Sequence, residues 1–406
     1  MHVIFVEPRF PANQREFVRG LHEAGATVTG VGEAPVGALG EELRGHMVAY
    51  EQVSSVCDEE AMLETVRRIQ ARGWVDRLEA TVEAHILPVA RVRKQAGIPG
   101  TSVETAWLCR DKPAMKEALR AADVPTARSA GANSAEEVRA FAAEVGFPLI
   151  LKPRSGAGAS GTWRAADAGE LERVIVESRV DRGQPVAVEE YIEGHEGFYD
   201  TLTVDGKPVH DFVSHYYPNV LEAMRTRWIS PQIVVTNRMD APAYRELFAL
   251  GAKVIGALGI GTSASHMEWF FGPKGLKFSE IGCRPPGVGL WDLYCQANEF
   301  DLYREWGFAI AHGRPDRKPT RKFAAGMIAL RPDRDGRIKG YEGADEVLER
   351  FRPFVIDAHL PPPGTPTQPV EGGYMANAFV RMRHPDFDGL REILDEVGRT
   401  LKVRAE

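Results

Sequence analysis

The sequence predicts an α/β protein that opens with a parallel sheet and continues through mixed α+β segments. A strand at residues 2–6, a helical pattern from about Asn13 to Ala24 and a strand from Ala26 to Val31 form a β-α-β start, and further alternation follows to about residue 98. Strand-like apolar runs then alternate with helical patterns along the rest of the chain. Hydrophobic residues make up 44% of the chain and charged residues 26%, which is typical of a globular protein with a buried core.

Length, charge and cysteine content restrict the class of protein. A chain of 406 residues is expected to form two or three domains at roughly 150 residues each. The formal net charge of -7 disfavours a nucleic-acid partner, because such proteins present a basic face. The four cysteines are scattered without a Cys-x-x-Cys pair, so we expect reduced thiols in the cytosol. No apolar run of about 18 residues occurs, and the N-terminus is predicted to be a strand rather than a signal peptide, so we expect a cytoplasmic protein without a membrane span.

Start and stop signals divide the middle of the chain. Gly97-Ile-Pro-Gly100 closes the first region, and Asp111 can cap a helix that ends before Val124-Pro125. The segment from Ser134 to Glu137 is a capping-box pattern that opens a helix ending near Gly146. We further predict a strand at 147–153, a helix at 168–178, a strand at 186–192, two strands around the turn at 204–207, and a helix at 243–258.

After Pro319 the pattern begins again. We predict a strand at 322–330, a turn at 333–336, a helix at 345–351, strands at 354–359 and 374–383, and a closing helix at 387–401.

Two glutamates near residue 270 carry most of the chemical information. Glu268 and Glu280 each lie in an apolar-flanked alternating run, and Gly272-Pro-Lys-Gly275 between the runs is a turn sequence. Such a hairpin can place both carboxylates on one sheet face, where they repel each other unless a cation lies between them. Mg²⁺ takes this position beside substrate phosphates. Arg284 shares the face of Glu280 if the strand extends that far. The alternative is a surface hairpin with acidic residues.

A glycine-rich loop follows the predicted strand that ends at Lys152. Residues Gly156 to Gly161 match the G-x-G-x-x-G string, but Thr162 to Ala165 is predicted to be a short strand rather than the start of a helix. A strand-loop-strand with glycines at its tip is a flap whose backbone N–H groups can close on phosphates, with Lys152 supplying charge. The alternative is a plain surface hairpin. The chain contains no P-loop string.

The segment from Val188 to Glu196 is rich in glutamate. An extended segment exposes N–H and C=O groups that can pair with the edge of an adenine, and Glu196 is placed to accept hydrogen bonds from ribose hydroxyls. Taken alone, such a strand end is more often a solvated edge. Its meaning comes from its order relative to Lys152 and the two carboxylates.

That order resembles the ATP-grasp superfamily. The resemblance rests on Asp111-Lys112, the strand through Lys152 with its glycine loop, the 189–196 segment, and Glu268 and Glu280 through Arg284. It covers roughly residues 1–320, and the remaining residues resemble the extra lobe of the biotin-carboxylase-like branch, which includes ATP-dependent amino-acid ligases.

The resemblance implies an organisation in three parts. These are an N-terminal Rossmann-like parallel-sheet domain at 1–105, a two-subdomain ATP-grasp domain at 106–320, and a C-terminal α+β lobe at 321–406. Within the middle part we expect a flap subdomain at about 126–190 and a metal-binding subdomain at about 191–320.

The resemblance also implies roles for the motif residues. Glu268 and Glu280 are expected to hold Mg²⁺ or Mn²⁺, and Arg284 to steady the transferred phosphoryl group or the acyl phosphate. Lys116 we interpret as a helix-surface residue. At Gly282 many members have a metal-binding Asn, which leaves the number of metal ions open. The implied ATP-binding residues are Lys112, Lys152, Ser155, Gly156, Gly158, Ser160, Gly161, Glu189, Glu190, Tyr191, Ile192 and Glu196.

Enzymes of this superfamily phosphorylate a carboxylate with ATP, and a nucleophile, usually an amine, attacks the acyl phosphate. The leading hypothesis is therefore an ATP- and Mg²⁺-dependent carboxylate–amine ligase acting on small molecules, with Arg284, Lys152 and His266 as candidate catalytic residues. His266 shares a predicted strand face with Glu268, and it either meets a substrate or is structurally satisfied. Arg331 is either a substrate anchor or a solvated turn residue. Homodimers are usual in the resembling branch.

Two other functions stay open at this point. One is a biotin-carboxylase-like enzyme that activates bicarbonate as carboxyphosphate. The other is a non-catalytic ATP-binding protein, which the presence of both lysines and both carboxylates disfavours.

Overall fold

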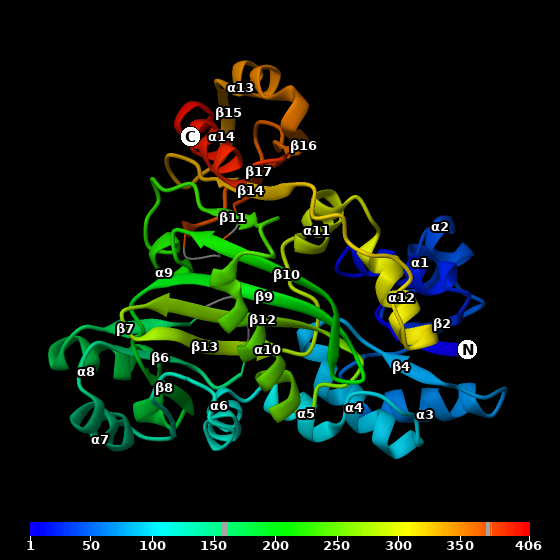
Figure 1. The fold of residues 1–406 in the computed structure, drawn as a ribbon. Coiled ribbons are helices and arrows are strands. Elements are labelled where there is room, and N and C mark those ends of the chain that lie inside the picture. The colour runs from blue at the N-terminus through cyan, green and yellow to red at the C-terminus, as the bar shows by residue number, and fades with distance from the viewer. Residues whose placement is uncertain (156–160, 371–373, 375) are drawn as a thin grey trace.

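The N-terminal region forms an open parallel sheet, as the sequence predicted (Figure 1). The computed structural model describes residues 1–155, 161–370, 374 and 376–406. The strand order is β3-β2-β1-β4, and all three pairings are parallel. The elements are β1 His2–Val6, α1 Gln14–Glu23, β2 Thr27–Gly32, α2 Glu41–Gly45, β3 Ala49–Gln52, α3 Glu59–Gln70, β4 Arg77–Glu79, α4 Glu83–Ala96 and α5 Val103–Leu108.

A small antiparallel sheet follows, in the order β5-β8-β6-β7. Its helices begin where the sequence predicted, because Asp111 accepts a hydrogen bond from the backbone N–H of Ala114 and Ser134 accepts one from that of Glu137. The sheet shares a core of its own with α7 and α8, whereas Met115 and Leu119 of α6 belong to a larger core. The elements are α6 Lys112–Ala121, β5 Ser129–Ala132, α7 Ala135–Val145, β6 Leu149–Pro153, β7 Trp163–Ala165, α8 Ala168–Glu177 and β8 Val186–Glu190.

An eight-stranded antiparallel sheet forms the centre of the molecule, in the order β13-β12-β9-β10-β11-β14-β17-β16. The sequence predicted most of these strands but not that the C-terminal ones extend the same sheet. The domain boundary near residue 321 stays a prediction. The strands are β9 His195–Val204, β10 Lys207–Tyr217, β11 Gln232–Val235, β12 Ser263–Gly272, β13 Gly275–Gly282, β14 Ala324–Leu330, β16 Val355–His359 and β17 Ala378–His384.

Helices cover both faces of this sheet. Helix α10 (Arg245–Ala257) packs in one core with Tyr199 and Met267, whereas α11 (Leu290–Asn298) and α12 (Leu302–His312) share the other core with Phe198 and Phe212. Neighbouring residues of one strand therefore face opposite cores, as strand alternation requires.

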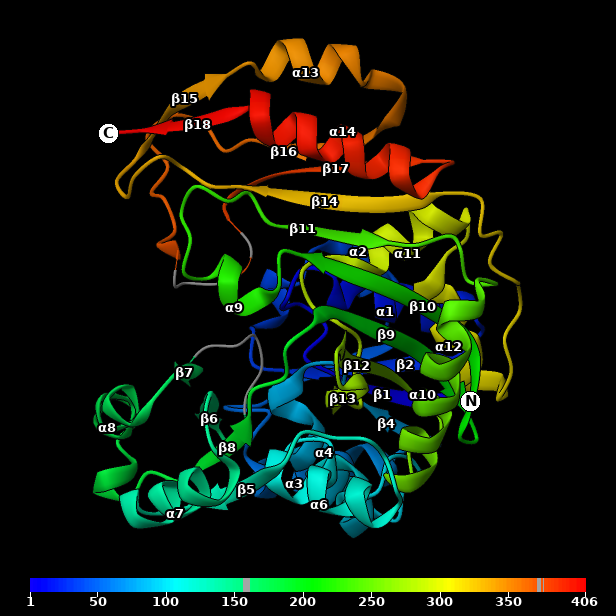
Figure 2. The same cartoon turned by 60° about the vertical axis from the view of Figure 1, so that its left-hand side comes forward.

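The C-terminal lobe packs along the far end of the sheet (Figure 2). Helix α14 places Leu390, Leu394 and Val397 in one core with Ile328 and Val380. The remaining elements are α9 Val220–Ala223, β15 Ile338–Glu342, α13 Ala344–Arg350, α14 Phe387–Thr400 and β18 Lys402–Ala405, where β15 pairs with β18. Across the described ranges, no helix combines the length and apolarity needed to cross a membrane.

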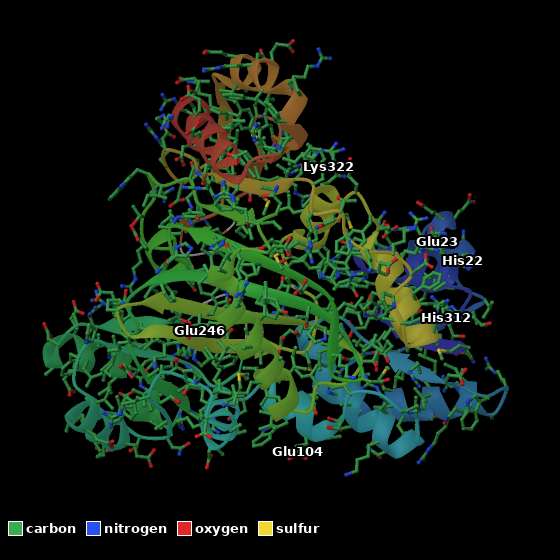
Figure 3. All side chains as sticks on the ribbon, viewed as in Figure 1. His22, Glu23, Glu104, Glu246, His312 and Lys322 are labelled. Carbon is green, nitrogen blue, oxygen red and sulfur yellow. The ribbon has the colours of Figure 1, made fainter. Side chains whose placement is uncertain are left out.

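A close crossing of α1 and α12 joins the N-terminal sheet to the central one. A Cβ atom on Gly20 would lie 2.2 Å from the carbonyl oxygen of Tyr303, and one on Gly307 would lie 2.2 Å from that of Gly20. His312 Nε2 also lies 2.8 Å from the carbonyl oxygen of Ala24, and Figure 3 shows His312 at this end of the crossing. The two backbones touch, so the crossing fixes the N-terminal sheet relative to the rest.

We expect Gly307→Ala to lower the free energy of unfolding by about 1–3 kcal/mol, because the added methyl must push the two helix backbones apart. The measurement is chemical denaturation followed by circular dichroism. Gly256→Ala is the matched control, because a Cβ there meets no atom within 4 Å and replacing a helical glycine is neutral or stabilising. Equal stability of the two variants would contradict the tight crossing.

Candidate functional site

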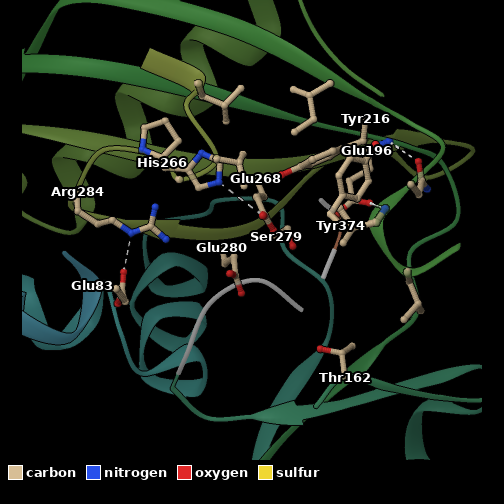
Figure 4. Close-up of a pocket in the computed structure, with 18 of the residues that line it drawn as sticks. Glu83, Thr162, Glu196, Tyr216, His266, Glu268, Ser279, Glu280, Arg284 and Tyr374 are labelled. Carbon is tan, nitrogen blue, oxygen red and sulfur yellow. Dashed lines mark hydrogen bonds and ion pairs between the residues drawn. The ribbon is translucent and has the colours of Figure 1, made fainter. Parts of the chain in front are cut away.

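A cleft of about 1550 Å³ lies where the four parts of the fold meet (Figure 4). Its walls include Glu83 beside the N-terminal sheet, Lys152 and Thr162 on the small sheet, Glu280 on the central sheet, and Arg381 in the C-terminal lobe. A cleft at the junction of several units is the usual form of a ligand site, and this one exceeds the volume of about 300–1,000 Å³ that is typical for one small ligand.

The two predicted carboxylates face this cleft from one hairpin. Glu268 on β12 and Glu280 on β13 are Cα partners in the antiparallel ladder, and the strands meet at the turn between Gly272 and Gly275. The register shifts after this pair, which leaves Ser279 as a bulge. Both side chains line the cleft. The hairpin prediction is confirmed, and a surface hairpin is excluded.

Three lysines surround the buried Glu189 and the partly buried Glu280 at the floor of the cleft. Lys112 Nζ lies 3.2 Å from Glu280 Oε2, and Lys152 Nζ lies 3.8 Å from the same atom. Lys152 Nζ also lies 3.0 Å from Glu189 Oε2, and Lys116 Nζ lies 2.6 Å from it. We refer to these five residues as the charge cluster. It contains one more positive than negative charge and therefore suits an anionic ligand.

The interpretation of Lys116 as a helix-surface residue is wrong. Its side chain is 1% exposed and contacts Glu189. Residues four apart lie on one face of a helix, so Lys112 and Lys116 both point from α6 into the cleft. Glu189 likewise turns its carboxylate to the two lysines.

Burial and neighbouring charges set the ionisation of the charge cluster. Burial raises the pKa of Glu189, but Lys116 and Lys152 outweigh it and lower that pKa to about 2. Burial lowers the pKa of Lys152, yet Glu189 and Glu280 raise it to about 12. For Lys116 burial prevails, with Lys152 adding to it, and its pKa falls to about 8. Glu189 is therefore ionised at neutral pH.

His266 is both structurally satisfied and part of the cleft wall. Its Nδ1 lies 2.6 Å from Asp200 Oδ1, and Tyr294 donates a hydrogen bond to the other oxygen of Asp200. Its Nε2 lies 3.7 Å from Glu268 Oε1. Burial lowers the pKa of His266, but Asp200 and then Glu268 raise it to about 9. A protonated imidazole is thus held beside Glu268. The sequence signal for Asp200 was a charged residue within an apolar strand.

Glu196 is a third carboxylate on the same sheet face. It lies in β9 and accepts a hydrogen bond of 2.8 Å from the backbone N–H of Val220 at the start of α9. Burial and then the charge of Glu268 raise its pKa to about 8. Figure 4 shows it on the side of the cleft where Tyr216 and Tyr374 lie.

Arg284 lies beyond the end of β13, so strand alternation does not position it. Its Nε donates a 2.9 Å hydrogen bond to Glu83 Oε2, and an Nη donates to the backbone of Pro285. A Cβ atom on Gly282 would lie 3.3 Å from that Glu83 oxygen, so Glu83 fills space beside the missing side chain. Sequence reasoning missed Glu83. Its place just past β4, at the carboxyl edge of a parallel sheet, was the available signal.

Of the other residues predicted to bind ATP, some line the cleft and others lie outside the described residues. Ser155, Glu190, Tyr191 and Ile192 line the cleft. The carboxylate of Glu190 is engaged by Lys274 and by the backbone N–H of Arg128. Gly161 has a φ of +70°, and its neighbour Thr162 lines the cleft. Gly156, Gly158 and Ser160 lie outside the described residues.

Arg331 does not line the cleft. Its guanidinium donates to the backbone carbonyls of Ala223 and Thr226, and the residue is 9% exposed. It therefore supports the segment around α9, and neither the substrate-anchor hypothesis nor the solvated-turn alternative holds.

Glu268 and Glu280 are the residues that fit a metal ion best. Mg²⁺ is commonly bound by one or two carboxylates together with substrate phosphates and water, and this pair offers oxygen ligands beside the lysines that could hold phosphates. Within the described residues there is no group of three or more His, Cys, Asp or Glu side chains arranged to hold a metal alone. The site therefore suits a metal that enters with a phosphate ligand.

Comparison with known proteins identifies the middle of the chain. Residues 117–300 match the ATP-grasp domain. The chain is 28% identical over 245 residues to the L-arginine-specific L-amino acid ligase of Bacillus subtilis, covering 59% of this chain and 58% of that protein. It is 25% identical over 235 residues to the alanine–anticapsin ligase of Bacillus subtilis strain 168, covering 52% of this chain and 48% of that protein.

The fold is also similar to that of a solved structure, the L-amino acid ligase from Bacillus licheniformis. The TM-score is 0.76 at 16% identity, over 100% of this chain and 98% of that one. The likeness at this identity is one of fold. The chain spans about half to three fifths of the length of the two curated ligases that it matches.

Lys116→Met should lower the free energy of unfolding by about 3 kcal/mol, because it removes one cation from a buried ion pair. Urea denaturation at pH 7 measures the change. Arg120→Met on the same helix is the control, since Arg120 is exposed and its loss should change stability by less than about 0.5 kcal/mol. A Lys116 variant as stable as the control would mean that the charge cluster contributes little to the fold.

Proposed function

We propose that this chain, whose residues 117–300 match the ATP-grasp domain, is an ATP- and Mg²⁺-dependent carboxylate–amine ligase that forms C–N bonds. The observation that supports the proposal most is the geometry of the charge cluster, in which Lys112 and Lys152 lie within 4 Å of Glu280, the register partner of Glu268. Cations and paired carboxylates at one point are the requirement of phosphoryl transfer, which depends on charge neutralisation and positioning.

The motif residues of the cleft have distinct roles in this proposal. Lys112 and Lys152 bind the phosphates of ATP, and a metal held by Glu268 and Glu280 would neutralise charge on the transferred phosphoryl group. Arg284, held by Glu83, orients the carboxylate that receives the phosphoryl group. Its guanidinium suits two oxygens in one plane.

The positions of His266 and Asp200 support the same chemistry. Asp200 holds the imidazole at Nδ1, so Nε2 points to Glu268 in a fixed orientation. A donor fixed in advance does not have to reorganise during the reaction, which is the basis of electrostatic preorganisation. His266 would thereby keep the Glu268 carboxylate in place for the metal.

The names of the relatives support an amino-acid ligase in particular. Among the relatives, the two curated ligases and the solved structure described above are named as ligases of amino acids. In the proposed reaction the γ-phosphoryl group moves from ATP to a carboxylate oxygen and ADP leaves. The amine nitrogen then attacks the acyl carbon, inorganic phosphate departs with the C–O bond electrons, and the amine loses its proton.

Release of ADP and phosphate with Mg²⁺ and ATP, measured across amino acids, other carboxylic acids, amines and bicarbonate, tests the proposal. We expect release that requires one acid and one amine together, with a condensation product detected by mass spectrometry. Release with bicarbonate alone would instead favour carboxyphosphate formation. ATP binding without any turnover would favour the non-catalytic alternative.

Glu280→Gln should reduce ATP turnover at least about 100-fold, because the neutral amide is a weaker metal ligand at the point where charge develops. The fold should be retained, as judged by an unchanged circular dichroism spectrum. Glu299→Gln, an exposed surface change, is the control and should keep full turnover. Full activity of the Glu280 variant would contradict the assignment of Glu280 as a metal ligand.

A further inference from the structure

Arg381 brings a cation from the C-terminal lobe into the cleft. On β17 the side chains of Ala378, Val380 and Met382 belong to the core of the lobe, so strand alternation turns Arg381 the other way. It lines the cleft, and its side chain is only 16% exposed. None of the roles proposed above uses this residue.

The guanidinium of Arg381 has unused hydrogen-bonding capacity. One Nη lies 3.3 Å from Asp292 Oδ2 and 3.4 Å from Asp357 Oδ2, both of which are partly exposed carboxylates. Its Nε is buried and has no hydrogen-bond partner among the described residues, and the guanidinium carbon lies 4.9 Å from the centroid of the Phe379 ring. Charge-assisted hydrogen bonds are normally about 2.7–2.9 Å long, and an unpaired buried donor is rare enough to need an explanation. The part of the side chain that stays exposed lines the cleft, where an anionic ligand can accept hydrogen bonds from its Nη groups.

The backbone beside Arg381 leaves room for its guanidinium. Gly289 has a φ of +69°, and a Cβ atom on it would lie 2.3 Å from the other Nη of Arg381. The segment Pro285 to Gly289 lines the cleft and connects Arg284 to this point. Five residues span at most about 18 Å, so the Cα atoms of Arg284 and Gly289 lie no farther apart than that, and both arginines line one cleft.

We propose that Arg381 anchors an anionic group, a carboxylate or a phosphate, of the substrate that supplies the amine. This proposal rests on the proposed ligase function. The carboxylate to be phosphorylated must lie at Arg284 and the two metal carboxylates, so a second cation elsewhere in the same cleft serves a different anion. An amino acid or a short peptide carries an amine and such an anion in one molecule.

Other arginines also line the cleft. Arg164 lies over the ring of Tyr191 in the predicted nucleotide-binding segment, whereas Arg15 and Arg225 are exposed. Solvent and salt screen an exposed charge, and exposed pairs contribute little. The more buried Arg381 is therefore the stronger anchor. Comparison of the Arg381→Met and Arg225→Met variants shows which of these two arginines binds the anionic group.

The test measures binding of the amine substrate without turnover. Purified protein is saturated with Mg²⁺ and a non-hydrolysable ATP analogue, which fills the nucleotide site, and titrated with L-amino acids, dipeptides, their C-terminal amides and inorganic phosphate. Arg381→Met is compared with wild type. Arg383→Met is the matched control, because Arg383 is two residues along the same strand, donates to Gln296 and does not line the cleft.

At least one amino acid, dipeptide or phosphate should bind wild type and the Arg383 variant equally and bind the Arg381 variant about 10- to 100-fold more weakly, the loss expected for hydrogen bonds to a charged group. Loss restricted to ligands with a free carboxylate identifies a carboxylate, whereas loss of phosphate binding alone identifies a phosphate. Equal binding by the Arg381 variant, a loss caused by Arg225→Met instead, or no binding to wild type would overturn the proposal.

Gly289→Ala is a second variant that leaves the arginine in the chain. Its added methyl should displace the guanidinium and weaken binding of the same ligands, with normal binding of the ATP analogue as proof of folding. Unchanged ligand binding by this variant would overturn the proposed position of the anchor.

The two proposals fail differently. Turnover that is identical in wild type and the Arg381 variant at every substrate concentration would contradict the anchor role of Arg381 and leave the proposed ligase function standing. Ligand binding that depends on Arg381, in a protein that never releases ADP, would support the anion site and contradict the proposed ligase function.

Discussion

The charge cluster at the floor of the cleft is the interaction on which the rest of the site depends. The buried carboxylate of Glu189 is stable only because Lys116 and Lys152 accompany it, since an uncompensated charge in the interior costs several kcal/mol. Lys112 and Lys152 also lie beside the partly buried carboxylate of Glu280. Coulomb energies are also larger in such a place than in water. The cluster therefore fixes the sheet carrying Glu189 against the hairpin carrying Glu280, and it presents surplus positive charge to whatever enters.

The central sheet determines which further residues can reach that floor. Because β14, β17 and β16 continue the sheet that contains the carboxylate hairpin, the C-terminal lobe is joined to the site by backbone hydrogen bonds rather than by side chains alone. The crossing of Gly20 and Gly307 holds the N-terminal sheet on the other side. Glu83 and Arg381 therefore meet one cleft although about 300 residues separate them in the sequence.

Elements with clear local signals were predicted well, and elements packed on several sides were not. Helices α6, α7 and α14 have polar caps and one apolar stripe, and they were located within one or two residues. Helices α11 and α12 were missed. Most of their residues are buried, so no polar face marks the helical period. Lys116 was misjudged because the sequence does not show what a lysine one helical turn after Lys112 contacts. Its partner, Glu189, lies in a distant strand.

By itself the sequence determined the order of the motifs, the hairpin that pairs Glu268 with Glu280, and the resemblance to ATP-grasp proteins, because these depend on local spacing and strand alternation. The tertiary structure decided which charges meet. In the folded protein Lys116 pairs with Glu189, and Asp200 holds His266. Glu83 binds Arg284, and Arg381 faces the cleft. Contacts between distant segments arise from the packing of sheets and helices, and no periodicity within either segment encodes them.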